Sequence, residues 1–174
     1  MDIHVAADLI EKAVTRQEAI WADLGAGTGT FTQALQQLLP SGKVYAVDKS
    51  PHALWRLPQH ASVPMEIVDA DFTKPLDLPP LDGILMANAL HYIDQPGTLL
   101  SQLTELLKPE GVFLLVEYET NRPRPPWIPF PIPFDAFKEI ALEVGLTPPV
   151  QIGKVSSMYG HDHIYAAMSQ WTPR

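Results

Sequence analysis

Three glycines at alternate positions, placed directly after an apolar stretch, constrain the fold of this chain more than any other feature. The apolar stretch 19–24 predicts a buried strand, and Gly25, Gly27 and Gly29 follow it. Residues 30–33 (Thr-Phe-Thr-Gln) fit a capping box, so we expect them to open a helix. A strand that turns through glycines into a helix lets a ligand approach the backbone and the free N–H groups of the helix start.

Short apolar runs and segments of helical periodicity alternate along the rest of the chain, which is typical of an α/β fold. The expected strands lie at 19–24, 44–48, 65–69, 83–87 and 112–118, and the segments 150–155 and 164–168 are expected to pair as an antiparallel hairpin. The expected helices lie at 3–14, 30–38, 50–57, 96–107 and 137–144. Ser50 is the expected N-cap of the third helix, and the fourth is expected to stop at a turn over 108–111.

Charge and composition argue against several classes of protein. Twelve basic and 20 acidic residues give a net charge of −8, which disfavours binding to phosphate backbones. The absence of cysteine excludes disulfides, thiolate catalysis and cysteine–zinc sites. Apolar runs such as 112–116 are far shorter than the ~20 residues of a membrane span, and the first residues lack the features of a signal peptide. We therefore expect one cytoplasmic domain over 1–174, with neither nucleic acid nor membrane as a partner.

An acidic residue, Asp48, ends the strand that follows the glycine turn. A carboxylate about 20 residues after such a turn accepts hydrogen bonds from ribose hydroxyls, so the two features predict a nucleotide-type cofactor. Asp48 also fits a charge at the start of the next helix, and both roles are compatible. The dinucleotide fingerprint requires Gly or Ala where this chain has Thr30, which makes a nicotinamide-dependent oxidoreductase the weaker hypothesis.

The segment Asp23-Leu24-Gly25-Ala26-Gly27-Thr28-Gly29 resembles motif I of the class I S-adenosylmethionine-dependent methyltransferases. Residues 82–92 resemble the stretch after strand four of this family, and residues 108–112 resemble its K-P-G-G turn, with Glu110 replacing one glycine. The resemblance covers most of the chain. It implies S-adenosylmethionine as cofactor and a doubly wound, mostly parallel seven-stranded sheet of order 3-2-1-4-5-7-6, with an antiparallel last hairpin and helices on both faces.

The resemblance also implies which residues bind the cofactor. They are Asp23, Gly25, Ala26, Gly27, Thr28, Asp48, Lys49, Asp71, Phe72, Asn88 and Ala89. In this alignment Asp23 orders the glycine loop and the amino end of the ligand, and Asp48 binds the ribose. Asp71 and Phe72 contact the adenine, although Asp69 allows a second alignment. The last two residues of the set line the methionine end.

His91 and Tyr92 match positions that face the methyl group and the acceptor in the family, so they are the catalytic candidates. His91 is either a general base, because imidazole takes up a proton near neutral pH, or a wall residue that packs against the ligand. Tyr92 is expected to form a wall of the pocket. The implied activity is in-line methyl transfer to a small-molecule acceptor, and the alternative is a regulatory or interaction protein that binds S-adenosylmethionine without catalysis.

The segment 120–134 is rich in proline and contains Trp127, Phe130 and Phe134. It follows the carboxyl end of the expected strand 112–118, on the side where open α/β sheets bind ligands. We expect it to form a lip over the acceptor, or a homodimer contact with the same effect, and the alternative is a stiff linker.

Two histidines flank an aspartate at His161-Asp162-His163, which suggests a metal site. Further ligands at a recognisable spacing are missing from the sequence. We therefore expect a solvated turn there and no metal.

Overall fold

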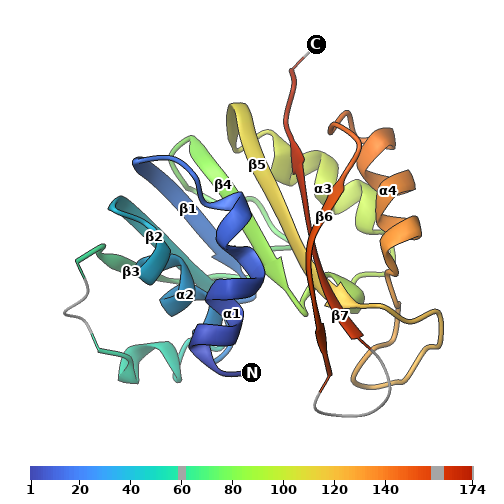
Figure 1. Ribbon diagram of the computed structural model, residues 1–174, viewed down its shortest axis with the longest axis horizontal. Coiled ribbons are helices and arrows are strands. Elements are labelled where there is room, and N and C mark those ends of the chain that lie inside the picture. The colour runs from blue at the N-terminus through green and yellow to red at the C-terminus, as the bar shows by residue number, and fades with distance from the viewer. Residues whose placement is uncertain (59–61, 158–162, 174) are drawn as a thin grey trace.

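The computed structural model describes residues 1–58, 62–157 and 163–173 (Figure 1). The helices are α1 (Ile3–Ile10), α2 (Thr30–Leu38), α3 (Pro96–Thr104) and α4 (Phe134–Glu143), with short 3-10 helices η1 (Glu11–Ala13), η2 (Leu54–Arg56) and η3 (Leu90–Tyr92). The strands are β1 (Glu18–Leu24), β2 (Ser41–Asp48), β3 (Met65–Asp69), β4 (Leu81–Ala87), β5 (Leu107–Tyr118), β6 (Val150–Ser156) and β7 (His163–Gln170). Within the described ranges, no helix is both long and apolar enough to cross a membrane.

The described strands form one sheet in the order β3-β2-β1-β4-β5-β7-β6, which confirms the order that the resemblance implies. Strands β1 to β5 run parallel to one another, and β7 runs antiparallel to both β5 and β6. The parallel strands therefore present their carboxyl ends along one edge of the sheet. The strand order reverses between β1 and β4, and ligands of open α/β sheets bind at such a point.

Helices cover both faces of the sheet and create two apolar layers (Figure 1). Leu85 of β4 packs in one layer with residues of α1 and α2, including Ile10 and Leu35. The neighbours of Leu85, Ile84 and Met86, pack in the other layer with residues of α3 and α4. Because both faces are covered, β4 and β5 are apolar on consecutive positions rather than on alternate ones.

The expected capping box at the start of α2 is wrong. Thr30 is already helical, and the N-cap is Gly29, which has no side chain to donate or accept. Gly29 adopts a left-handed φ of 79°, and its carbonyl accepts from the backbone N–H of Gln33 at 3.0 Å. A Cβ on Gly29 would lie 2.3 Å from the end of the Leu57 side chain, which would have to shift, and the left-handed conformation itself favours glycine here.

Several further boundaries differ from the sequence-based expectation. The expected helix 3–14 ends as α1 at Ile10 and continues as η1, β2 begins at Ser41, and α4 begins at Phe134. The segment 50–57 forms a turn and the 3-10 helix η2 rather than a helix capped by Ser50, whose backbone N–H instead donates to the Asp48 carboxylate at 2.8 Å. Helix α3 ends at Thr104 because Leu107 pairs with Leu81 as the first residue of β5. The expected turn over 108–111 consequently lies within β5.

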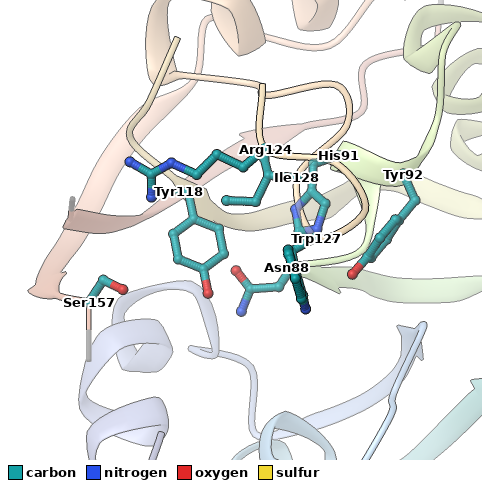
Figure 2. Close-up of a pocket in the computed structure, with 8 residues that line it drawn as sticks. All are labelled: Asn88, His91, Tyr92, Tyr118, Arg124, Trp127, Ile128 and Ser157. Carbon is teal, nitrogen blue, oxygen red and sulfur yellow. The ribbon is translucent and has the colours of Figure 1, made fainter. Parts of the chain in front are cut away.

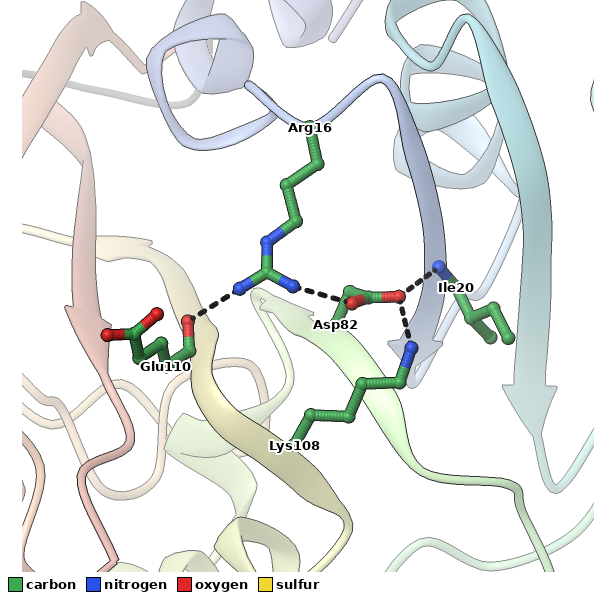
Figure 3. A network of polar contacts seen from close by, with 5 residues as sticks. All are labelled: Arg16, Ile20, Asp82, Lys108 and Glu110. Carbon is green, nitrogen blue, oxygen red and sulfur yellow. Dashed lines mark hydrogen bonds and ion pairs between the residues drawn. The ribbon is translucent and has the colours of Figure 1, made fainter.

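A polar network fastens the amino ends of β1, β4 and β5 together (Figure 3). One carboxylate oxygen of Asp82 accepts from Arg16 at 2.8 Å, and the other accepts from Lys108 and from the backbone N–H of Ile20, both at 2.8 Å. Arg16 also donates to the carbonyl of Glu110 at 3.2 Å. Asp82 lies at the edge of the sheet opposite the ligand-binding edge, so the acid that begins the 82–92 stretch has a structural role.

Candidate active site

Two adjoining cavities open at the carboxyl edge of the sheet. The first, which we call the glycine cavity, has a volume of about 590 Å³. It is lined by Gly25, Gly27, Asp48, Lys49, Ala70, Asp71, Phe72, Thr73, Asn88, Ala89, Tyr92 and Ile93. Most of the residues that the resemblance assigns to the cofactor therefore lie around one space. In the part of the chain that the structure describes, Ala26, Thr28 and Asp23 do not line this cavity.

The glycine turn forms the floor of this cavity. The backbone N–H groups of Gly25 and Ala26 both donate to the carbonyl of Val47, at 2.9 and 3.1 Å, which fastens the turn to β2. Gly25 has a left-handed φ of 79°, and a Cβ there would lie 2.8 Å from Ala89 Cβ and 3.2 Å from Phe72. A side chain at this position would fill space between two lining residues, so glycine keeps the floor open to a ligand.

Asp48, at the end of β2, stands at the mouth of the glycine turn. Its Oδ2 accepts from the backbone N–H of Gly27 at 2.8 Å, and its Oδ1 accepts from the N–H of Ser50 at 2.8 Å. The carboxylate is therefore held in place by backbone donors before a ligand arrives. That this carboxylate binds a ribose stays a prediction.

The two alternatives for the adenine-binding acid occupy different places. Asp71 and Phe72 line the glycine cavity, whereas Asp69, paired with Asp48 in the sheet, does not. The Oδ1 atom of Asp71 accepts from the backbone N–H of Thr73 at 2.9 Å and from its hydroxyl at 2.7 Å. These hydrogen bonds lower the pKa of Asp71 below its ordinary value, so it is an anion that can accept a further donor.

Asp23 lies buried beneath the glycine loop, where its Oδ2 accepts from the hydroxyl of Thr32 in α2 at 2.7 Å. Burial raises the pKa of this carboxyl to about 7, against the opposing effect of the Thr32 hydrogen bond, and the nearby charge of Asp48 raises it further. Asp23 thus connects the end of β1 to the first turn of α2. Its contact with the amino end of a ligand stays a prediction.

The second cavity, which we call the histidine cavity, has a volume of about 530 Å³. It is lined by Asn88, His91, Tyr92, Tyr118, Arg124, Trp127, Ile128 and Ser157. Figure 2 shows these side chains at the ends of β4 and β5, in the segment that follows β5 and, for Ser157, directly after β6. Asn88 and Tyr92 line both cavities, so they mark the place where the two spaces meet.

Asn88 turns the chain out of β4 with a left-handed φ of 51°. Asparagine tolerates this conformation better than most residues, and its backbone N–H still donates to Val116 at 2.8 Å, as if β4 continued. The side-chain Oδ1 is buried and has no hydrogen-bond partner among the described residues. A buried acceptor without a partner is costly, so this oxygen is suited to accept a donor from a bound molecule.

His91 forms a buried pair with Glu117, a residue that the sequence analysis did not identify. The Nδ1 atom of His91 lies 2.7 Å from Glu117 Oε2, and the two side chains are 2% and 1% exposed. The other ring nitrogen, Nε2, is buried and has no partner among the described residues. A signal for Glu117 was present, since it is the one carboxylate in the otherwise apolar strand 112–118, and a buried charge requires a partner.

The proline-rich segment 120–134 packs beside this pair. The backbone N–H of Phe130 donates to the carbonyl of His91 at 3.0 Å, and the hydroxyl of Tyr165 donates to the carbonyl of Ile132 at 2.8 Å. Trp127 and Ile128 of this segment line the histidine cavity, and Trp127 is 72% exposed. The side chains of Phe130 and Phe134, in contrast, are not among the described residues that line it.

The candidate metal motif is only partly described. His161 and Asp162 lie outside the described residues, and His163 is the exposed first residue of β7. Among described residues there is no group of three or more His, Asp or Glu side chains arranged to hold a metal ion.

Known proteins resemble this chain in both sequence and structure. A family model described as "Methyltransferase domain" matches residues 22–113. The trans-aconitate 2-methyltransferase of Escherichia coli is 30% identical over 116 residues, which are 67% of this chain and 45% of that protein. The release factor glutamine methyltransferase of Mycolicibacterium smegmatis is 42% identical over 79 residues, 43% of this chain and 28% of that protein. The chain thus spans less than half the length of these curated relatives.

Solved structures share the whole fold. The 1,6-didemethyltoxoflavin-N1-methyltransferase of Burkholderia thailandensis, solved with 1,6-didemethyltoxoflavin and S-adenosylhomocysteine bound, aligns with a TM-score of 0.78 at 23% identity over 98% of this chain and 78% of that one. A SAM-dependent methyltransferase of Aquifex aeolicus aligns with a TM-score of 0.69 at 19% identity, over 98% of both chains. With its sheet order and a family match over more than half of its residues, the chain belongs to the class I S-adenosylmethionine-dependent methyltransferase family.

Proposed function

We propose that this protein binds S-adenosylmethionine in the glycine cavity and directs its methyl group to a small molecule in the histidine cavity. One observation carries the proposal: the two cavities adjoin, and Asn88 and Tyr92 line both of them. A cofactor in one space and an acceptor in the other would meet beside these two residues. Methyl transfer requires such an end-to-end arrangement because the nucleophile attacks in line with the bond that breaks.

The residues of the glycine cavity fit the cofactor part by part. The open floor at Gly25 accommodates the methionine part, Asp48 accepts from the ribose hydroxyls, and Asp71 with Phe72 holds the adenine. The orphaned Oδ1 of Asn88 accepts a donor at the methionine end. Bound S-adenosylmethionine supplies a methyl group that its sulfonium already activates, so the protein's contribution is to position the partners and exclude water.

The histidine cavity supports an acceptor of small-molecule size. Its volume of about 530 Å³ lies within the ~300–1,000 Å³ of small-molecule sites, and aromatic side chains form much of its lining. The names of two relatives, which refer to trans-aconitate and to 1,6-didemethyltoxoflavin, point to the same class of acceptor. Trp127 and Ile128 give the proline-rich segment the role of a lip over this acceptor.

Charge supports the remaining parts of the proposal. A net charge of −8 repels phosphate backbones and anionic membrane surfaces, so we infer that neither is the partner. We also infer one functional domain and a cytoplasmic location, which fractionation of cells would test. Whether the proline-rich segment contacts a second copy of the chain is a question for sedimentation analysis.

Ligand binding and methyl transfer test the proposal in two steps. We expect S-adenosylmethionine and S-adenosylhomocysteine, at about 100 times their dissociation constants, to stabilise the fold by about 2.7 kcal/mol, whereas NAD has no effect. The unfolding midpoint should rise by roughly 5–10 °C for a chain of this size. A panel of phenols, alcohols, N-heterocycles and carboxylic acids is then incubated with methyl-labelled cofactor, and label in the acceptor is counted.

The outcomes separate the hypotheses. Binding with label transfer to a member of the panel supports the proposed enzyme. Binding without transfer to any acceptor, together with a stable protein partner, overturns it in favour of a non-catalytic binding protein. Stabilisation by NAD alone overturns the cofactor assignment.

A further inference from the structure

The orientation of the Glu117 carboxylate is fixed by the backbone on one side and by His91 on the other. Its Oε1 accepts from the backbone N–H groups of Leu90 and His91, at 3.1 and 3.2 Å. Its Oε2 lies 2.7 Å from His91 Nδ1 and also accepts from the backbone N–H of Tyr118 at 3.3 Å. Each oxygen therefore has its own hydrogen-bond partners. A half-turn of the carboxylate would exchange the two oxygens and would still place a carboxylate oxygen against His91 Nδ1.

This arrangement determines which ring nitrogen carries the proton. An ionised carboxylate only accepts hydrogen bonds, so the contact with Oε2 places a proton on Nδ1. In the neutral ring the lone pair then lies on Nε2. That atom is buried, has no partner among the residues described, and belongs to a ring that lines the histidine cavity (Figure 2).

A purely structural role accounts for only half of these contacts. Oε1 alone fastens the short helix η3 to β5 through two backbone donors. The second oxygen accepts from the Tyr118 N–H within β5, but its contact with Nδ1 and the buried lone pair of Nε2 add nothing to the connection between η3 and β5. A buried acceptor without a partner costs about 1–3 kcal/mol. The arrangement is instead suited to a ligand that brings a hydrogen-bond donor to Nε2.

We propose that Glu117 is a positioning residue that holds His91 in the Nδ1–H tautomer, so that Nε2 accepts a proton from an acceptor bearing an O–H or N–H group. This inference rests on the proposed function. As the acceptor's electron pair forms a bond to the methyl carbon, its proton passes to Nε2, and the electron pair of the broken carbon–sulfur bond stays on sulfur. Glu117 stabilises the imidazolium that results, and the proton later leaves to water.

The same geometry selects among acceptors. A neutral hydroxyl or ring N–H gives Nε2 the donor that it lacks, whereas a carboxylate would place its oxygen lone pairs against the lone pair of Nε2. We therefore expect phenols, alcohols or N-heterocycles to be methylated in preference to carboxylates.

The substitution Glu117→Gln tests the tautomer directly. The amide oxygen of glutamine should stay with the two backbone donors, which turns the NH₂ group toward Nδ1. Nδ1 must then accept, and the proton moves to Nε2. Long-range ¹H–¹⁵N NMR of the histidine-labelled protein distinguishes the two tautomers. The sample is saturated with S-adenosylhomocysteine where this ligand binds. The variant His91→Gln identifies the His91 signal among those of the six histidines.

We expect Nδ1–H in the wild type and Nε2–H in Glu117→Gln. Glu119→Gln is the matched control, because this carboxylate lies two positions along the chain and contacts the backbone of Phe134 rather than His91. It should leave the tautomer unchanged. A wild-type ring with its proton on Nε2, a ring protonated on both nitrogens at pH 7.5, or the same tautomer in Glu117→Gln would each overturn the proposal.

Kinetics with an acceptor from the panel give a second readout. Glu117→Gln should lower kcat by about 10²–10⁴-fold while the KM of the acceptor and the affinity for S-adenosylhomocysteine change less than threefold. Equal losses in kcat and in S-adenosylhomocysteine affinity would indicate a structural role and overturn the inference. The tautomer measurement does not depend on turnover, so failure to find methyl transfer and failure of the Glu117 assignment remain distinguishable.

Discussion

Asp48 holds the glycine loop through Gly27 and lines the glycine cavity, where we propose that it binds a ribose. Hydrogen bonds to a charged group contribute about 1.5–3 kcal/mol. We therefore expect Asp48→Ala to raise the dissociation constant of S-adenosylhomocysteine by about 10–100-fold in isothermal titration calorimetry. Asp69→Ala is the matched control, since Asp69 is the sheet partner of Asp48 and lies outside the cavity. Wild-type affinity in Asp48→Ala would remove the ribose assignment.

The sequence favoured Asp71 as the adenine-binding acid, with Asp69 as the alternative, and of the two only Asp71 lines the glycine cavity. Asp71 is held by Thr73 and is only partly buried, so one more hydrogen bond to the adenine amine should contribute modestly. We expect Asp71→Ala to weaken S-adenosylhomocysteine binding about three- to tenfold, and Asp69→Ala to leave it within twofold. The reverse ranking by calorimetry would move the assignment to Asp69.

Asp23 makes stability depend on pH in an unusual direction. Its folded pKa of about 7, raised chiefly by burial, exceeds the ordinary value of 3.8, so the folded state binds this proton more tightly than the unfolded chain. The free energy of unfolding should therefore fall as pH rises from about 4 to 7, by at most about 1.4 kcal/mol per unit from this group, and then level off.

Asp23→Asn removes this dependence while its amide oxygen still accepts from Thr32. The variant should gain stability over the wild type, by a few kcal/mol at pH 8 and by clearly less at pH 5. Urea unfolding at both pH values measures the two differences. A difference that is the same at pH 5 and pH 8 would show that Asp23 does not titrate between them.

Single residues with a motif around them were predictable, whereas residues defined by tertiary contacts were not. The turn at Gly25 and the acid Asp48 have a fixed spacing along the chain, and both line the predicted cavity. Glu117 and His91 belong to no motif of fixed spacing. They are 26 positions apart in the chain, and only the folded β5 places Glu117 beside His91. Its role depends on the pairing of β4 with β5, which the sequence indicates only through the apolar strands themselves.

The proline-rich segment between β5 and α4 is tied to the sheet by Tyr165 of β7. The Tyr165 hydroxyl is buried and donates to the Ile132 carbonyl, and burial, with the charges of Glu117 and Glu119, raises its pKa. Tyr165→Phe leaves that carbonyl without this donor, so we expect a loss of about 1–3 kcal/mol in urea unfolding. The control Tyr92→Phe, whose side chain is exposed, should stay within about 0.5 kcal/mol. Equal stability of both variants would show that the tether contributes little.

Elements with a long apolar pattern matched the structure, and the errors lie at their ends. Strands β3 and β5 and the hairpin β6–β7 appear where the patterns predicted them. The range of α2 was predicted correctly, but its N-cap was wrong, because a left-handed Gly29 without a capping side chain occupies the position expected for Thr30. The expected helix over 50–57 was also wrong, because this segment forms a turn and η2, with the Ser50 N–H bound to the Asp48 carboxylate two positions earlier.

On the scale of the molecule, the two edges of the sheet have separate functions. The carboxyl edge holds both cavities, and the amino edge holds the network around Asp82. Strand β4 connects them, so the 82–92 stretch that resembles the family motif combines an anchoring acid at one end with Asn88 and His91 at the other. Stability and ligand binding should therefore respond independently to substitutions at the two edges.

Asp82→Asn tests this independence. Burial disfavours the charge of Asp82, but hydrogen bonds from Lys108 and Ile20 and the charges of Lys108 and Arg16 outweigh burial and lower its pKa. A lowered pKa stabilises the fold above the ordinary value of 3.8, and this stabilisation disappears as pH falls through the folded pKa. We expect Asp82→Asn to lose about 1–3 kcal/mol at pH 7, and the difference from wild type to shrink toward pH 3.

The exposed Lys43–Glu66 pair on β2 and β3 provides the control, since Glu66→Gln should change stability by less than about 1 kcal/mol. Folded Asp82→Asn should bind S-adenosylhomocysteine with wild-type affinity, because Asp82 lies at the opposite edge from the glycine cavity. Urea unfolding at pH 7 and pH 3, with calorimetry at pH 7, measures both quantities. A parallel loss of stability and affinity would mean that β4 transmits strain from one edge of the sheet to the other, and that the two edges are not independent.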